Sequence, residues 1–260
     1  MLKLKDYVTL MNGLCGFLSV VLVIRGQLVF ASVLVFIGWA FDAMDGAVAR
    51  LTKQHNKFGG ELDNMCDMIT WAMAPSFIVY AYYERFFSSL QILQNPSWLP
   101  WVLACVLGAM PITFGAVRFA RFSATELKAE GYWIGLPRPV SAFIIVSFLN
   151  SHLFAHPLGP YVGIVLCFIL FPLNMTLIPF ISHHAGWWSG FLTGLMITVA
   201  GTSLAGLAAG FITGDFGFFF DSFFFWMTGY LFLAWSYIPA RDWHKVRQDL
   251  AEWRHRELTG

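Results

Sequence analysis

Charged residues are scarce in this chain. Asp, Glu, Lys and Arg make up 12% of its 260 residues, whereas about a quarter is usual in soluble domains. The 16 basic and 15 acidic residues nearly cancel to a formal net charge of +1, so no strong positive field indicates nucleic acid as a partner. This scarcity, together with 58% hydrophobic residues, excludes a soluble globular domain and indicates an integral membrane protein.

Cysteine pairs and a leader cleavage site are also lacking. The four cysteines, at 15, 66, 105 and 167, show no CxxC spacing and no histidine pairing. This excludes a disulfide framework and a zinc site of the usual pattern, and we predict buried free thiols. No small-residue cleavage site follows the first apolar stretch, so we expect that stretch to remain as the first membrane helix.

Long apolar runs are what the sequence does contain. Runs of about 18 residues or more cross the hydrocarbon core as helices, and they predict an all-α, polytopic transmembrane helix bundle of about eight spans. The predicted spans are 8–25, 28–49, 61–83, 99–121, 138–155, 160–178, 187–208 and 216–239.

The basic residues are distributed unevenly about these spans. Only two of the 16 Lys and Arg residues, Arg25 and Arg85, fall on the side opposite the termini. By the positive-inside rule we expect both termini to face the cytoplasm. The polar tail at 241–260 is either an amphipathic helix that offers Trp243, Leu250 and Trp253 to the membrane surface or a solvated basic tail.

A carboxylate inside an apolar span costs free energy to bury in the membrane and is usually functional. This chain has four such carboxylates in its second and third spans. Asp42 and Asp45 are three residues apart on one helix, and Asp63 and Asp67 are four apart on the next, so each pair lies on one stripe. Both pairs lie near the shared loop, where four carboxylates would repel one another without cations. Oxygen-only ligands favour two hard cations, Mg²⁺ or Mn²⁺.

Gly46 and Arg50 complete a pattern typical of phosphoryl transfer. Gly46 permits close approach to the backbone, and the Arg50 guanidinium, one turn after Asp45 and Gly46, is suited to a phosphate oxygen. Ion pairing of the acids with basic residues, or a cation pathway in a transporter, remains an alternative. A transporter is expected to show related halves around a midplane site, and the sequence has no internal repeat.

These residues form a signature. Asp42-x-x-Asp45-Gly46-x-x-Ala49-Arg50, eight further residues, and Gly59-x-x-x-Asp63-x-x-x-Asp67 resemble the full signature of the CDP-alcohol phosphotransferases. The resemblance implies an integral membrane enzyme that moves a phosphatidyl or similar group from a CDP-linked donor to an alcohol and releases CMP. It also implies that the four aspartates surround two divalent cations and that Asp67 is the base for the acceptor hydroxyl.

The same resemblance implies a domain organisation and a donor site. It implies a homodimer and a six-helix catalytic core, which we expect at residues 1–185. Beyond this core, the span and charge counts predict two additional helices at 186–240 and a cytoplasmic basic tail at 241–260. The expected donor-binding residues are Thr9, Asn12, Gly46, Ala49, Arg50 and Gly59. For Thr9 and Asn12, at the start of the first helix, capping is an equal alternative.

Within the family, residues 58–75 and 131–142 are similar to the CDP-diacylglycerol–serine phosphatidyltransferases. This favours CDP-diacylglycerol or a similar CDP-lipid as donor and L-serine as acceptor, with glycerol 3-phosphate, inositol phosphate and choline as alternatives. The predicted acceptor-binding residues flank the loop between the fourth and fifth spans, and positive-inside anchoring alone would explain two of them. They are Arg118, Arg121, Lys128 and Arg138.

Overall fold

The computed structural model describes residues 3–52, 57–125, 132–181, 190–233 and 243–259. The chain forms two compact units, Met1–Gly115 and Ala116–Gly260, and each is described by itself. This division is distinct from the one predicted at residue 185, which stays a prediction.

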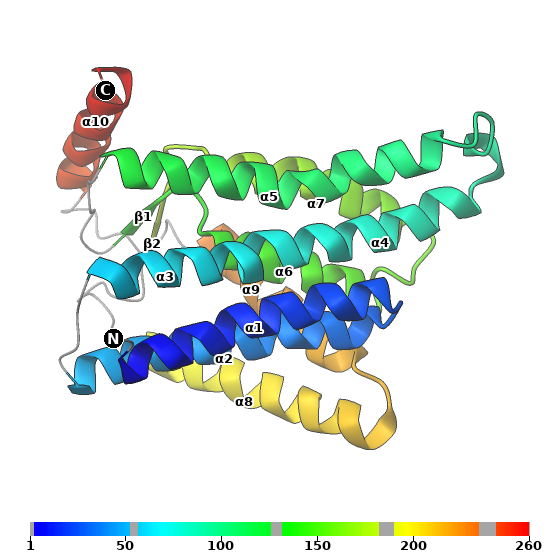
Figure 1. The fold of residues 1–260 in the computed structure, drawn as a ribbon, viewed down its shortest axis with the longest axis horizontal. Helices are drawn as coiled ribbons and strands as arrows, with labels where there is room; N and C mark the ends of the chain where they lie inside the picture. The colour runs from blue at the N-terminus through cyan, green and yellow to red at the C-terminus, as the bar shows by residue number, and fades with distance from the viewer. Residues whose placement is uncertain (1–2, 53–56, 126–131, 182–189, 234–242, 260) are drawn as a thin grey trace. The chain divides into compact units, whose positions relative to one another are not determined.

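The first unit consists of helices that follow one another along the chain (Figure 1). The helices α1 and α2 are joined by a short turn in which Gly26 has a φ of 77°, a left-handed conformation that glycine adopts without steric cost. The elements are α1 (Leu4–Ile24), α2 (Leu28–Thr52), α3 (Lys57–Met68), the π-helical turn η1 (Ile69–Met73), α4 (Ala74–Ser89), the 3₁₀ turn η2 (Gln91–Leu93) and α5 (Leu99–Thr125), which continues into the second unit.

Glycines let α1 and α2 approach the segment formed by α3 and η1. A Cβ at Gly13 would lie 2.9 Å from Cys66 Sγ, and one at Gly16 would lie 2.7 Å from Thr70 Oγ1. On α2, a Cβ at Gly38 would lie 2.8 Å from Thr70 Cγ2. Small residues at these positions permit close helix packing in membranes, and the contacts bring together the three segments that carry the aspartates and Asn12.

The second unit combines helices with a small sheet. Strands β1 (Tyr132–Ile134) and β2 (Pro179–Ile181) pair antiparallel, with Trp133 opposite Phe180. The chain turns after β1 at Gly135, where φ is 69° and a Cβ would lie 2.7 Å from the carbonyl oxygen of Asn174. The remaining helices are α6 (Arg138–Asn150), α7 (Gly159–Leu173), α8 (Gly190–Thr213), α9 (Gly217–Leu233) and α10 (Trp243–Thr259).

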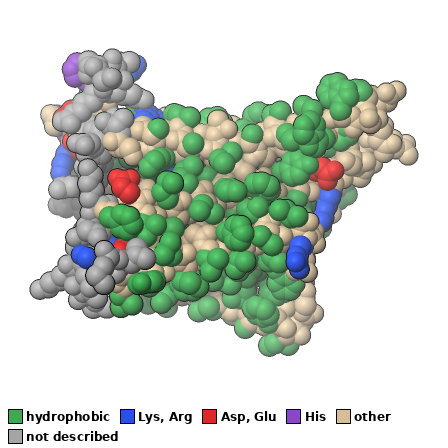
Figure 2. All heavy atoms as spheres, in the orientation of Figure 1, with side chains coloured by type: hydrophobic (Ala, Val, Ile, Leu, Met, Phe, Trp, Pro, Cys, Tyr) green, Lys and Arg blue, Asp and Glu red, His purple; other side chains and the backbone are tan. Residues whose placement is uncertain are grey.

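The prediction of an all-α, polytopic membrane bundle is confirmed, with the two three-residue strands as the exception. Among the described residues, three helices are long and apolar enough to cross a membrane: Leu4–Ile24, Leu28–Gly46 and Leu99–Ser123. Hydrophobic side chains cover most of the visible face over α1 and α4 (Figure 2). The other predicted spans coincide with the α3–η1–α4 segment and with α6, α7, α8 and α9.

Two details differ from the sequence-based expectations. All four cysteines are free, but Cys105 is only half-buried. The tail does contain a helix, α10, but Trp253 is 1% exposed and packs with Val246 against Tyr132 and Ile134. Neither of the two alternatives for the tail includes this packing of Trp253, which β1 makes possible by offering the side chain an apolar surface within the protein.

Candidate active site and metal centre

Three of the four predicted carboxylates converge in the first unit. Asp42 lies on α2, and Asp63 and Asp67 lie on α3. One carboxylate oxygen from each lies within 4.8 Å of the others, and all three side chains are half-buried. The spacing of four residues explains why α3 contributes two of them, since such residues share one face of a helix.

Asp45, the fourth predicted carboxylate, contacts α1. It is buried, and its Oδ2 accepts a hydrogen bond of 2.5 Å from the hydroxyl of Thr9 on α1. Three residues along an α-helix correspond to a rotation of about 300°, so Asp45 points about 60° away from Asp42. The hydrogen bond to Thr9 gives Asp45 a contact with α1, and its predicted role as a metal ligand stays a prediction.

Asp67 is held by donors from two segments. Its Oδ1 accepts a hydrogen bond of 3.2 Å from Asn12 Nδ2 and one of 2.9 Å from Trp71 Nε1. Thr70 Oγ1 donates to the Asn12 carbonyl oxygen at 2.9 Å. Asn12 and Thr70 are fully buried, and Trp71 is 2% exposed. Sequence reasoning missed Thr70 and Trp71, although the spacing of four residues between Asp67 and Trp71 was available as a signal.

The donor set fits a hard divalent cation. Carboxylates confined within 4.8 Å repel one another when ionised, and a bound cation removes that repulsion. Oxygen ligands suit Mg²⁺ and Mn²⁺. Asp42, Asp63 and Asp67 are the residues that would hold such an ion.

The other predicted donor-site residues lie along the same helices. Gly46 follows Asp45 on α2 and is half-buried, and Gly59 is buried on α3, one turn before Asp63. Ala49 and Arg50 belong to α2, but their side chains lie outside the described part of the structure.

The predicted acceptor-binding arginines belong to the second unit, where two of them contact the backbone. Arg118 is 6% exposed, and its Nη1 donates to the carbonyl oxygens of Ile134 at 2.8 Å and Asn174 at 2.9 Å. Arg121 Nη1 donates to the Met175 carbonyl oxygen at 2.5 Å. These bonds tie the end of α5 to β1 and to the segment after α7.

The remaining predicted acceptor residues differ in what the structure describes. Arg138 is half-buried at the start of α6, with its guanidinium carbon 5.7 Å from the centre of the Phe119 ring. Lys128 lies outside the described residues.

Helix α10 packs on the same part of the second unit. The Arg121 guanidinium carbon lies 4.4 Å from the centre of the Trp253 ring, a cation–π contact. Tyr132 Oη donates to Asp249 at 2.9 Å. Burial, and then this hydrogen bond, raise the pKa of Tyr132, so the hydroxyl remains the donor at neutral pH.

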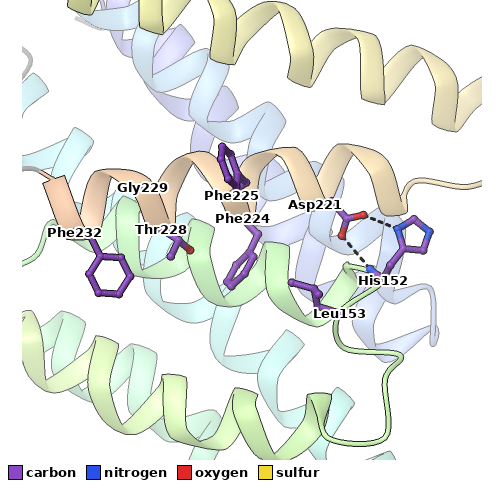
Figure 3. A pocket seen from close by; sticks show the side chains of 8 residues that line it. All are labelled: His152, Leu153, Asp221, Phe224, Phe225, Thr228, Gly229 and Phe232. Carbon is purple, nitrogen blue, oxygen red and sulfur yellow. Dashed lines mark hydrogen bonds and ion pairs between the residues drawn. The ribbon is translucent and has the colours of Figure 1, made fainter.

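A groove of about 560 Å³ also lies in the second unit, lined by apolar side chains such as Leu153, Phe224 and Phe232 (Figure 3). At one end, His152 Nδ1 lies 2.5 Å from Asp221, and Nε2 lies 3.3 Å from Asp215. The bond to Asp221 is the main reason why the pKa of His152 is raised. The groove contains no residue of the carboxylate cluster.

Together, the apolar helices and the carboxylate cluster define a polytopic membrane protein with a candidate divalent-metal centre. A model of the CDP-alcohol phosphatidyltransferase family matches residues 2–178. The chain belongs to this family.

Curated relatives carry more specific names. The chain is 29% identical over 168 residues to the CDP-diacylglycerol–serine O-phosphatidyltransferase of Methanocaldococcus jannaschii, covering 64% of this chain and 71% of the relative. It is 33% identical over 132 residues to the enzyme of the same name from Helicobacter pylori, covering half of each chain. It is 28% identical over 184 residues to the archaetidylserine synthase of Methanothermobacter thermautotrophicus, covering 70% of each.

Proposed function

We propose that this protein transfers a phosphatidyl group from CDP-diacylglycerol, or a similar CDP-lipid, to the hydroxyl of L-serine and releases CMP. The observation that carries the proposal is the convergence of Asp42, Asp63 and Asp67 within the stretch that matches the family model. The names of the relatives from M. jannaschii and H. pylori support serine as the acceptor.

In this reaction Asp67 takes the proton of the serine hydroxyl. The hydroxyl oxygen forms a bond to the lipid-side phosphorus, and the bond from that phosphorus to the CMP oxygen breaks, so CMP leaves with the electron pair. Asn12 and Trp71 hold Asp67 Oδ1 while the proton moves. Two divalent cations, Mg²⁺ or Mn²⁺, would neutralise the negative charge of the diphosphate when the aspartates bind them.

The donor and acceptor bind to different sets of residues. The CDP moiety is bound along α1, α2 and α3 by Thr9, Asn12, Gly46, Ala49, Arg50 and Gly59. The serine carboxylate is bound by the basic group Arg118, Arg121, Lys128 and Arg138. Within that group, Arg118 and Arg121 also donate to the backbone carbonyl oxygens of Ile134, Asn174 and Met175, so these two side chains have a structural role beside the proposed one.

The proposed setting of the enzyme follows from the charge distribution and the family. Both termini and the active site face the cytoplasm, because Arg25 and Arg85 are the only basic residues expected on the opposite side. The lipid donor enters from the bilayer and serine enters from the cytoplasm. The enzyme is a homodimer, as the resemblance to the family implies.

A reconstitution assay tests the proposal. Purified protein receives CDP-diacylglycerol, Mg²⁺ and one labelled acceptor at a time, and both CMP and the lipid product are measured. We expect CMP release and phosphatidylserine with serine. CMP release only with glycerol 3-phosphate, an inositol phosphate or choline would overturn the acceptor. Cation uptake into proteoliposomes that depends on the aspartates, without CMP release from any acceptor, would establish a transporter instead.

A further inference from the structure

The helix that carries Asp63 and Asp67 changes its geometry directly after Asp67. Residues Ile69–Met73 form a π-helical turn, η1, between α3 and α4. Such single turns are rare and are frequent at functional sites. Trp71 lies in this turn and is 2% exposed, so its indole N–H is cut off from water and needs a partner within the protein.

The partner of the Trp71 indole is the candidate base. Trp71 Nε1 donates to Asp67 Oδ1 at 2.9 Å, and Asn12 Nδ2 on α1 donates to the same oxygen at 3.2 Å. A carboxylate held by two donors from different helices cannot rotate about its Cβ–Cγ bond without breaking both hydrogen bonds. Bonds to a carboxylate are about twice as strong as those between neutral groups.

The same turn also fixes the second donor. Thr70, the neighbour of Trp71, donates to the Asn12 carbonyl oxygen at 2.9 Å, and its side chain lies against Gly16 and Gly38. The π-helical turn therefore contacts Asp67 directly through Trp71 and indirectly through Asn12.

We propose that Trp71 is a positioning residue for Asp67. Its indole N–H, together with the Asn12 amide, sets the orientation in which the Asp67 carboxylate binds a divalent cation and accepts the acceptor proton. The catalytic part of this inference rests on the proposed function, whereas the effect on cation binding does not.

The substitution that tests the proposal is Trp71→Phe, which keeps an aromatic ring and removes the N–H donor. We expect kcat to fall about tenfold because the loss concerns a bond to a charged group, while KM for the CDP-lipid and for serine stays within about twofold. Trp98→Phe is the matched control, because Trp98 is 58% exposed and precedes α5. Unchanged kcat in Trp71→Phe would overturn the proposal.

A double variant distinguishes a positioning role of Trp71 from a packing role. Trp71→Phe and Asn12→Ala each remove one of these two donors to Asp67 Oδ1, and the double variant removes both. We expect the double variant to lose more activity than the product of the two single losses, since either donor alone partly orients the carboxylate. Losses that simply multiply would show that Trp71 and Asn12 act independently, which contradicts their joint positioning of Asp67.

A measurement without turnover distinguishes failure of this inference from failure of the proposed function. In protein with ¹⁵N-labelled indole groups, Mg²⁺ added without substrate is expected to shift one indole N–H resonance in the wild type, and not in Asp67→Asn. That resonance is expected to be absent in Trp71→Phe. If no indole responds to Mg²⁺ although Mg²⁺ binds, Trp71 does not position Asp67. A wild type that responds to Mg²⁺ but releases no CMP would instead refute the proposed function alone.

Discussion

The carboxylates of the first unit and the arginines of the second are both clusters of like charge, but they differ in what each side chain contacts. Asp42, Asp63 and Asp67 bring oxygens within 4.8 Å of one another, an arrangement that could hold a divalent cation. Arg118 and Arg121 instead donate to backbone carbonyl oxygens, which bear partial negative charge, so no anion is needed for them to be stable. The comparison shows that two clusters of like charge can differ in kind: the carboxylate oxygens face one another, whereas the two arginines are hydrogen-bonded to the backbone.

The largest expected effect comes from removing a member of the carboxylate cluster. Asp42→Asn keeps the size of the side chain and removes one anionic ligand, so we expect activity to fall at least about a hundredfold. Mn²⁺ affinity, measured by electron paramagnetic resonance, is expected to fall with it. EDTA is expected to abolish activity in the wild type, and added Mg²⁺ or Mn²⁺ to restore it. Full turnover in excess EDTA would show that the cluster needs no cation.

The next effect concerns the packing that brings the cluster together. Gly16→Ala places a Cβ 2.7 Å from Thr70 Oγ1 and 2.9 Å from its backbone, and such overpacking costs about 1–3 kcal/mol. We expect a lower melting temperature in detergent and weaker Mn²⁺ binding, because Thr70 contacts Asn12. Gly60→Ala is the matched control, since a Cβ there meets nothing within 4 Å. Equal melting temperatures for the two variants would contradict the packing argument.

An effect of similar size compares two arginines of the proposed acceptor-binding group. Arg118→Gln leaves the carbonyl oxygens of Ile134 and Asn174 without their donor, and we expect the free energy of unfolding to fall by about 1–3 kcal/mol. Arg138→Gln is expected to raise KM for serine about tenfold with a smaller change in stability, because it removes one charge-assisted contact to the acceptor. Thermal unfolding and steady-state kinetics of both variants decide the matter. An increase in serine KM for Arg118→Gln alone would assign the acceptor contact to Arg118.

Local spacing made much of the first unit predictable. Apolar runs locate α1, α2 and α5, and helical periodicity brings Asp63 and Asp67 to one face, because both depend on residues close in sequence. The direction of Asp45 toward Thr9 depends on how α1 packs against α2, and spacing within α2 does not contain that information.

The second unit was less predictable because its contacts join distant residues. Strands β1 and β2 have three residues each and lie about 45 residues apart in sequence, too short for an alternating pattern to be recognised. The amphipathic pattern of the tail predicts a helix, but it does not distinguish a membrane surface from a protein surface as the partner of Trp253.

The smallest expected effect concerns His152, which contacts Asp215 and Asp221. In this cluster, opposite charges are already paired. Because these carboxylates raise the pKa of His152 above its ordinary value of 6.5, the contacts stabilise the fold fully below about pH 6.5. That stabilisation is lost as the pH rises through the raised pKa of the folded state. The pKa of Asp215 is lowered, mainly by the backbone N–H of Gly217, so this carboxylate remains ionised at pH 6. The side chains of His152 and Asp215 are half exposed, so solvent weakens the pair, and we expect His152→Gln to lower the melting temperature by only a few degrees at pH 6. The difference from the wild type is expected to shrink at pH 9, and a difference that grows with pH would mean that His152 is neutral in the folded protein.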